Sequence, residues 1–374
     1  MQDTIKNSKE YDLIVIGAGS GGVRAARIAA NHGAKVAIIE SIRVGGTCVL
    51  RGCVPKKLLV YGSHIAHDIE DAAGFGWNIG SIEHDWAKLI AAKDKELDRL
   101  NNIYLNLLSK VDIINGFGKI ISNNEVQING NIIKANKILI AVGGRPFLPK
   151  IQGIDLCINS DQALDLKKLP KKIIINGGGY IALEFAAIFA SLGSDVTLIY
   201  RGKNLLRGFD YDISRLIKEE YIKSNIKVLT ETEITSISKT KDALSVTLNN
   251  NKNIVSNEVM FATGRVPNTK GLGLGDIGVQ TGLVGEIIVD KNNQTNIDNI
   301  YAIGDVTNRI NLTPVAIAEG QVFSDNYFGG MTRVCDYENV ASAVFSQPAI
   351  GVVGFNELEA NNLYAEDGGI EVYK

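Results

Sequence analysis

Two cysteines, Cys48 and Cys53, are separated by four residues within the stretch 45–58 (GGTCVLRGCVPKKL). Thiols at this spacing can close a small disulfide ring that carries two electrons, form half of a zinc site, or simply fill a core. Zinc would need two further ligands, and the other cysteines, Cys157 and Cys335, stand far from any histidine. A purely structural disulfide would restrain little unfolded-chain entropy, because its loop is short. The position of the pair, immediately after a dinucleotide-binding pattern, favours a redox dithiol.

That pattern is a strand, a glycine-rich turn, a helix, a second strand and an acid. Residues 11–16 (YDLIVI) predict a buried parallel strand, residues 23–31 a helix, and residues 35–39 a second strand closed by Glu40. The turn contains Gly17, Gly19, Ser20, Gly21 and Gly22. Its glycines let backbone N–H groups approach a pyrophosphate, while Glu40 can accept hydrogen bonds from ribose hydroxyls. The alternative is a tight strand–helix turn without a ligand.

The same pattern recurs in the second half of the chain. Residues 172–175 predict a strand, residues 180–192 an alanine-rich helix, and residues 196–200 the next strand. The turn and the start of the helix contain Gly177, Gly178, Gly179, Tyr180 and Ile181. An internal repeat of this unit predicts that the chain binds two nucleotides.

The two copies differ where the fingerprint has its acid. The second copy has Tyr200 where the first has Glu40, and Arg201 and Arg207 follow. An acid would repel a 2′-phosphate, whereas arginines offer charge-assisted hydrogen bonds to it. The second site is therefore predicted to prefer NADP to NAD, the alternative being that both arginines are solvated surface charges.

The remaining elements are read from shorter patterns. Helices are predicted at 58–73, 86–110, 213–225 and 356–363, antiparallel meanders at 111–135 and 226–259, strands ending in glycine turns at 138–146, 260–268 and 295–305, and a strand pair at 344–353. Asp305, at the end of one such strand, is either a structural cap or a contact for a nucleotide.

Composition excludes several classes of protein. The 374 residues are 45% hydrophobic and 21% charged, as in ordinary globular proteins, and a net charge of -2 gives no reason to expect nucleic acid or an anionic membrane as partner. No apolar run reaches the length of a membrane span. The polar first ten residues lack the apolar core of a signal peptide, so a cytoplasmic location is expected.

The cysteine stretch, the two nucleotide units, ATGRVPN at 262–268 and YAIGD at 301–305 together resemble the pyridine nucleotide-disulfide oxidoreductases over nearly the whole chain. The Leu-Arg between the cysteines is similar to the glutathione reductase branch of plants and some bacteria. The resemblance implies an α/β fold with two Rossmann-like nucleotide-binding domains and three-layer sheets, the second domain inserted in the first, plus an incomplete C-terminal α+β dimerisation domain. The implied domains are FAD-binding at 1–150 and 269–333, NADPH-binding at 151–268, and dimerisation at 334–374.

The resemblance also implies an electron path from NADPH through FAD and a Cys48–Cys53 disulfide to glutathione disulfide. Cys53 would face the flavin, and Cys48 would attack the substrate. Lys57, paired with Glu184, would supply positive charge beside the reduced flavin. The implied FAD contacts are Ser20, Gly21, Glu40, Thr47, Lys57, Gly118, Asp305 and Thr313. The implied NADPH contacts are Gly178, Ile181, Glu184, Arg201, Arg207 and Gly264, with Tyr180 covering the flavin until nicotinamide arrives.

Substrate recognition is implied at Ser20, Arg27 and Tyr104. Arg27 would bind a glutathione carboxylate, and Tyr104 would wedge between the two halves of the substrate. An arginine at this place favours anionic glutathione disulfide over cationic trypanothione. Gln321 stands where many relatives have another carboxylate-binding arginine, a departure that bears on affinity.

A larger departure concerns proton transfer. The family members are homodimers in which a C-terminal His-Glu pair assists the partner's dithiol, but the histidines here are His32, His64, His67 and His84. The expectation is a C-terminally truncated chain, competent for FAD and NADPH chemistry but impaired in disulfide turnover. The alternatives are another NADPH-dependent disulfide reductase of the family, or a flavin-binding remnant that is inactive or reduces only dyes. Dihydrolipoamide dehydrogenase is disfavoured because it binds NAD and would carry an acid near Tyr200.

Overall fold

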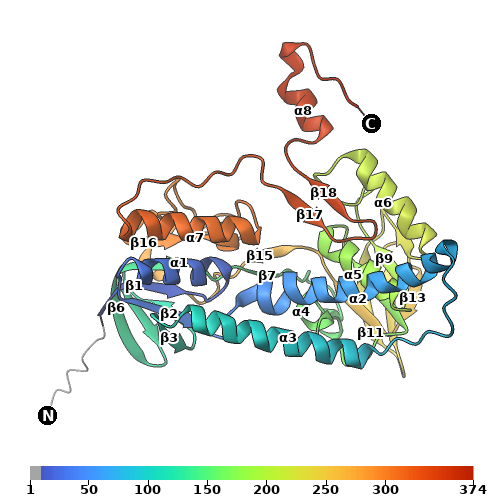
Figure 1. Ribbon diagram of the computed structural model, residues 1–374, viewed down its shortest axis with the longest axis horizontal. Coiled ribbons are helices and arrows are strands. Elements are labelled where there is room, and N and C mark those ends of the chain that lie inside the picture. The colour runs from blue at the N-terminus through green and yellow to red at the C-terminus, as the bar shows by residue number, and fades with distance from the viewer. Residues whose placement is uncertain (1–9, 374) are drawn as a thin grey trace. The chain divides into compact units, whose positions relative to one another are not determined.

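The computed structural model describes residues 10–373, which form two compact units (Figure 1). Unit 1 consists of Met1–Val54, of which residues 10–54 are described, together with Lys95–Arg145 and Arg265–Tyr337. Unit 2 consists of Pro55–Asp94, Pro146–Gly264 and Glu338–Lys374. Most of the polar N-terminal stretch therefore lies outside the described residues.

Unit 1 is built on a mixed sheet around β1. The sheet has the order β3 (Asp112–Asn115), β2 (Val36–Glu40), β1 (Glu10–Ile16), β6 (Asn131–Ile140), β5 (Glu125–Ile128) and β4 (Lys119–Ile120), and β16 (Ile300–Ala302) also pairs with β6. Five of these strands run parallel to one another, namely β3, β2, β1, β6 and β16. β5 pairs antiparallel with β6, and β4 pairs antiparallel with β5. A parallel core of this kind places the ends of its strands, and the turns that follow them, along one edge.

Two helices, α1 (Ser20–Asn31) and α7 (Thr313–Phe328), lie side by side in unit 1 (Figure 1). Their backbones approach closely. A Cβ on Gly320 would lie 2.5 Å from the carbonyl oxygen of Gly21. The strand β1 explains the two cores of this unit, because Leu13 and Val15 pack with α1 and α7, while Ile14 and Ile16 pack on the opposite face.

Unit 2 repeats the parallel arrangement. Its first sheet has the order β10 (Lys227–Leu229), β9 (Asp195–Ile199), β8 (Lys172–Asn176) and β14 (Glu258–Phe261), all parallel. The helices α5 (Tyr180–Ser191) and α6 (Tyr211–Lys223) connect these strands. A separate antiparallel sheet contains β11 (Ile234–Lys239), β12 (Leu244–Leu248) and β13 (Asn253–Ser256).

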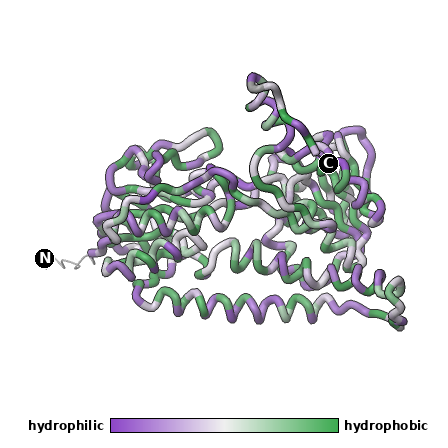
Figure 2. The backbone as a smooth tube through the Cα atoms, turned by 45° about the horizontal axis from the view of Figure 1, so that its top comes forward, coloured by the Kyte–Doolittle hydropathy of each residue, from purple (hydrophilic) through white to green (hydrophobic). Residues whose placement is uncertain are grey.

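The long helices α2 (Cys53–Ala72) and α3 (Trp86–Leu107) each contribute to both units along the chain. Figure 2 shows hydrophobic and hydrophilic residues alternating along α3, as expected for an amphipathic helix. Leu59, Trp86 and Ile90 pack in the core of unit 2, and the indole nitrogen of Trp86 donates a 2.7 Å hydrogen bond to the carbonyl of Leu166.

The smaller elements complete the fold. They are α4 (Ser160–Ala163), α8 (Glu357–Leu363), the pair β7 (Gly144–Pro146) and β15 (Arg265–Pro267), and the antiparallel pair β17 (Ser342–Val344) and β18 (Ile350–Val352). Among residues 10–373, no helix combines the length and the apolar character needed to cross a membrane.

The main strands and helices predicted from sequence are confirmed, but the meanders are partly wrong. β3 and β10 are parallel edge strands of the two nucleotide sheets rather than members of antiparallel meanders. β6 is one ten-residue strand that joins the end of the first predicted meander to the start of the strand predicted at 138–146. Periodicity identifies a strand but not its partner, and for this reason short runs such as 112–115 were misassigned.

Residues 55–94 and 338–374 pack with unit 2. Compactness reflects side-chain packing and does not identify which nucleotide each part binds. The cofactor domains at 1–150, 151–268, 269–333 and 334–374 therefore stay a prediction.

Candidate active site

The first glycine turn leaves no room for a side chain at Gly17 or Gly22. Gly17 has φ +105°, and a Cβ there would lie 2.4 Å from the carbonyl oxygen of Ala141. A Cβ on Gly22 would lie 2.0 Å from the carbonyl oxygen of Gly17. The N-cap of α1 is Gly19, and no side chain caps the first N–H groups of the helix, which suits a pyrophosphate site.

Glu40 closes β2 beside this turn. One carboxylate oxygen accepts a 2.8 Å hydrogen bond from the backbone N–H of Ala18, and the other accepts a 2.9 Å bond from that of Ile42. These bonds orient the carboxylate, and its remaining lone pairs can accept bonds from ribose hydroxyls. Gly118 lies nearby in unit 1, because a Cβ there would be 3.1 Å from the side chain of Ile39.

The dithiol lies in unit 1 between a π-helical turn and the start of α2. Cys48 belongs to the turn Thr47–Arg51, and Cys53 is the first residue of α2. Neither cysteine is in a disulfide, and Cys48 is half-buried whereas Cys53 is exposed. The hydroxyl of Thr313, at the start of α7, lies 3.6 Å from the sulfur of Cys53. The structure thus brings together Cys48, Cys53 and Thr313.

The surroundings of Cys48 oppose its ionisation. Its hydrogen bond with Cys53, followed by burial, raises the pKa of the Cys48 thiol far above its ordinary value. Hydrogen bonds with the hydroxyls of Thr313 and Ser20 act in the opposite direction. Because the thiolate is the nucleophile, this site requires a base or a cation to activate Cys48.

Of the predicted substrate residues, Tyr104 lies near the dithiol. Burial raises the pKa of its phenol, and its hydroxyl interacts with that of Ser20. Sequence reasoning missed Arg24, which is close enough to influence Tyr104 and donates a 3.2 Å hydrogen bond to Gln321. Its spacing of three residues from Arg27 on α1 was the signal that could have found it. Arg27 itself is half-buried, and its guanidinium has no hydrogen bond or ion pair within residues 10–373.

Asp305 belongs to the 3₁₀ turn Gly304–Thr307, which follows β16. Burial raises the pKa of its carboxyl, opposed by the positive charge of Arg265 and by its own backbone N–H. A half-buried acid with so few protein donors fits a ligand that carries hydroxyl groups.

The second glycine turn, in unit 2, has the geometry of the first. Gly177 has φ +155°, and a Cβ there would lie 2.4 Å from the carbonyl oxygen of Ala262. A Cβ on Gly178 would lie 2.5 Å from the ring of Tyr200, whereas Gly179 is open. Around this turn the other predicted NADPH contacts are Tyr180 and Ile181 at the start of α5, the exposed Arg201 and Arg207, and Gly264 at φ +120°.

The predicted ion pair between Lys57 and Glu184 is wrong. Lys56 forms that pair, with its ammonium 2.7 Å from the Glu184 carboxylate, and both side chains are buried. Glu184 also accepts a 2.9 Å bond from the backbone N–H of Phe345. The ammonium groups of both lysines lie over the Phe345 ring, that of Lys56 at 4.2 Å and that of Lys57 at 3.4 Å from its centroid, but the ion pair with Glu184 is formed by Lys56.

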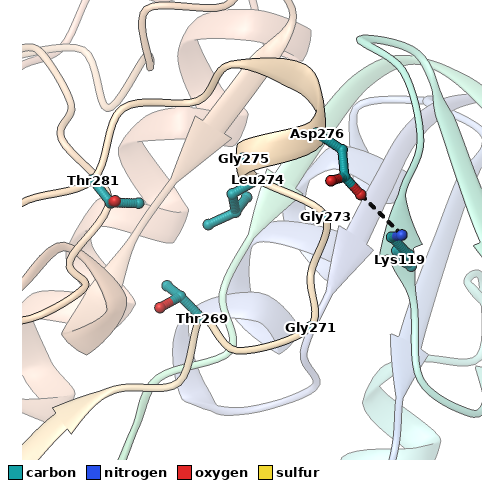
Figure 3. Close-up of a pocket in the computed structure, with 8 residues that line it drawn as sticks. All are labelled: Lys119, Thr269, Gly271, Gly273, Leu274, Gly275, Asp276 and Thr281. Carbon is teal, nitrogen blue, oxygen red and sulfur yellow. Dashed lines mark ion pairs between the residues drawn. The ribbon is translucent and has the colours of Figure 1, made fainter.

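A separate hollow of about 450 Å³ lies in unit 1 (Figure 3). It is lined by the glycine-rich segment 269–276 and by Thr281 and Lys119, whose ammonium forms a 2.9 Å ion pair with Asp276. None of its lining residues belongs to the predicted cofactor or substrate sites.

Two glycine turns, a dithiol and half-buried acids at strand ends are the features of a nucleotide-dependent disulfide reductase. The family model for pyridine nucleotide-disulphide oxidoreductase matches residues 11–320. The chain belongs to this family. The HOCl-induced flavoprotein disulfide reductase RclA from Escherichia coli, solved as a Cu(II) complex, superposes with a TM-score of 0.86 at 28% identity, covering 96% of this chain and 80% of that one.

Its sequence relatives include two proteins that share one name, glutathione reductase. The chain is 49% identical over 366 residues to glutathione reductase from Burkholderia cepacia, an alignment that covers 97% of this chain and 81% of the relative. It is 48% identical to the chloroplastic/mitochondrial glutathione reductase of Pisum sativum, covering 97% of this chain and 68% of the relative.

Replacing Lys56 tests the corrected ion pair. Lys56→Met leaves the buried Glu184 carboxylate without its cation, and we expect it to lower the free energy of unfolding by about 3 kcal/mol. The matched variant Lys57→Met removes a half-exposed cation over an aromatic ring and should cost less than about 1 kcal/mol. Urea denaturation of both variants measures the difference. Equal losses would contradict the assignment.

Replacing Thr313 tests the environment of the thiol. Because its hydroxyl lowers the pKa of Cys48, Thr313→Val should raise that pKa and slow iodoacetamide labelling of Cys48 by about tenfold near pH 8. Labelling of the wild type should accelerate as pH rises, since more thiolate is present. Peptide mass spectrometry of the reduced protein resolves Cys48 from Cys53. Thr313→Ser keeps the hydroxyl and should retain the rate, so an equally slow serine variant would refute the explanation.

Proposed function

We propose that this chain is an NADPH-dependent flavoprotein disulfide reductase that acts on glutathione disulfide. The observation that carries the proposal is the reduced pair of Cys48 and Cys53, which lies beside Thr313 in the same unit as the first glycine turn. The identity to glutathione reductases supports the substrate.

The cofactors would be FAD in unit 1 and NADPH in unit 2. When bound, FAD supplies two-electron transfer between the nicotinamide and the dithiol. The N-terminus of α1, which no side chain caps, would bind the pyrophosphate. Glu40 would bind the ribose, and Asp305 the sugar-alcohol hydroxyls. In unit 2, Arg201 and Arg207 would bind the 2′-phosphate by charge-assisted hydrogen bonds. Lys56, rather than Lys57, would carry the buried positive charge, held in place by Glu184.

The dithiol step can be written with its atoms balanced. The Cys48 thiolate attacks one sulfur of glutathione disulfide, which forms a mixed disulfide and releases one glutathione thiolate. The Cys53 thiolate then attacks the Cys48 sulfur and releases the second glutathione, leaving a Cys48–Cys53 disulfide. Two electrons and two protons, taken up by the Cys48–Cys53 disulfide, would restore the dithiol. Each released thiolate takes up one proton.

Those protons need a carrier. The raised pKa of Cys48 means that a base must remove its proton, and the sequence has no histidine after His84. General acid–base assistance contributes about two to four orders of magnitude. These 374 residues should therefore accept electrons from NADPH readily and pass them to glutathione disulfide slowly, which makes dye reduction the second candidate activity.

Substrate recognition would involve Arg27 and Tyr104, with Ser20 between Tyr104 and Cys48.

A homodimer and a cytoplasmic location are part of the proposal. The reducing cytoplasm suits a working dithiol. The exposed apolar side chains of Phe355, Leu358 and Leu363 around α8 favour an interface there.

The decisive assay compares acceptors. We expect the purified, FAD-loaded chain to oxidise NADPH with a dye acceptor at a substantial rate and with glutathione disulfide at a rate lower by about two orders of magnitude or more. NADPH should also produce a long-wavelength flavin–thiolate absorbance band, which Cys53→Ser abolishes. Material that binds no flavin, or that gives the same spectrum with Cys53→Ser, would overturn the proposal.

Replacing Arg201 tests the choice of nucleotide. Arg201→Ala removes charge-assisted hydrogen bonds to the 2′-phosphate, so KM for NADPH should rise by roughly tenfold or more while KM for NADH barely changes. Dye-linked kinetics measure both constants. Arg215→Ala, an exposed arginine on α6 paired with Glu219, serves as a control for lost surface charge. Equal changes in the two constants would refute the phosphate site.

A further inference from the structure

Glu319, on α7, is a buried acid to which none of the reaction steps above assigns a role. Its residue is 1% exposed. One carboxylate oxygen accepts a 2.6 Å hydrogen bond from the backbone N–H of Gly304. The other accepts bonds from the guanidinium of Arg309 at 2.8 Å and from the hydroxyl of Tyr337 at 2.7 Å. Three donors, one of them cationic, offset the cost of burying this charge.

The donors come from three places in unit 1. Gly304 begins the turn that carries Asp305, and its φ of +73° is one that glycine adopts without strain. Arg309 lies just after that turn, where it also hydrogen-bonds the Asn293 side chain. Tyr337 is the last residue of the unit, and its ring lies under the Arg309 guanidinium at 4.9 Å. Glu319 therefore joins the Asp305 turn to the end of unit 1.

The helix that carries Glu319 cannot shift easily. Gly320, the next residue, faces the carbonyl oxygen of Gly21 at a distance that leaves no room for a Cβ, and a Cβ on Gly21 would lie 2.9 Å from the carbonyl oxygen of Ala316. α7 is thus held against the first turn of α1. A carboxylate on such a helix fixes the Gly304 peptide relative to the glycine turn.

We propose that Glu319 is a positioning residue for the flavin site, which acts by holding the Gly304 peptide so that the Asp305 carboxylate stays in place for the sugar-alcohol hydroxyls of the dinucleotide. The inference rests on the proposed FAD site. Because Glu319 acts through Asp305, its effect on FAD affinity should depend on the Asp305 side chain. A residue that only stabilised the fold would have no such dependence.

A double-mutant cycle on FAD affinity tests this dependence. The apoprotein is titrated with FAD, and flavin fluorescence reports the dissociation constant for the wild type, Glu319→Gln, Asp305→Ala and the double variant. Glu319→Gln should weaken FAD binding by about tenfold, because the amide cannot accept bonds from all three donors. In the Asp305→Ala background the same substitution should weaken binding by less than about twofold.

A second variant guards against misfolding. Tyr337→Phe removes one donor but leaves the Gly304 contact, and should weaken FAD binding by about two- to fivefold, again only when Asp305 is present. The thermal midpoint of each apoprotein is recorded as the measure of a purely structural role.

The outcomes are distinguishable. If Glu319→Gln or Tyr337→Phe lowers the thermal midpoint but leaves FAD affinity unchanged, or if its effect on affinity is as large without Asp305, the positioning role is overturned. If the wild type itself binds no FAD, the proposed function fails, and this inference fails with it.

Discussion

The close approach of α7 to α1 is the constraint on which unit 1 depends. Glycine at positions 21 and 320 lets the two backbones come within a distance that any side chain would prevent. The contact is strengthened by Ser324, whose hydroxyl donates a 2.8 Å hydrogen bond to the carbonyl of Ala25. α7 in turn presents Thr313 to the dithiol at its N-terminus and Glu319 to the Asp305 turn near its middle. This one contact between two helices therefore positions the first glycine turn, the dithiol and the turn that carries Asp305.

The dithiol shows a division between electron transfer and proton transfer. Within unit 1, Ser20 and Thr313 place two hydroxyls on Cys48, which favour its thiolate, but burial and Cys53 outweigh them. Hydroxyl groups can stabilise a charge that has already formed, yet they cannot accept a proton at neutral pH. The two thiols can thus store electrons, whereas their fast exchange with a disulfide requires a base that removes the Cys48 proton.

Much of this arrangement could be predicted from sequence, because it depends on local patterns. Each of three features has a recognisable spacing of residue types: the two glycine turns, the central strands and the cysteine pair. Three features could not be predicted. Glu184 pairs with Lys56 and not with the neighbouring Lys57. Which of two adjacent lysines faces Glu184 depends on how α2 is turned about its axis, and the sequence does not specify this. The parallel edge strand β3 depends on a partner distant in sequence. The cluster around Glu319 joins Gly304 of the YAIGD stretch to Arg309 and Tyr337, which belong to no motif.

The two nucleotide units show how one backbone design serves two chemistries. In unit 1, Glu40 closes the second strand and accepts a hydrogen bond from the N–H of Ala18. In unit 2 the equivalent residue is Tyr200, and its ring covers the equivalent Gly178 so closely that a side chain there is excluded. The ring provides no charge, and the cations of Arg201 and Arg207 follow it along the chain. A carboxylate bonded to the turn suits free ribose hydroxyls, whereas an uncharged ring beside arginines suits a phosphorylated ribose. Gly178 is the counterpart of Ala18, and the Tyr200 ring occupies the space that an alanine Cβ would need there.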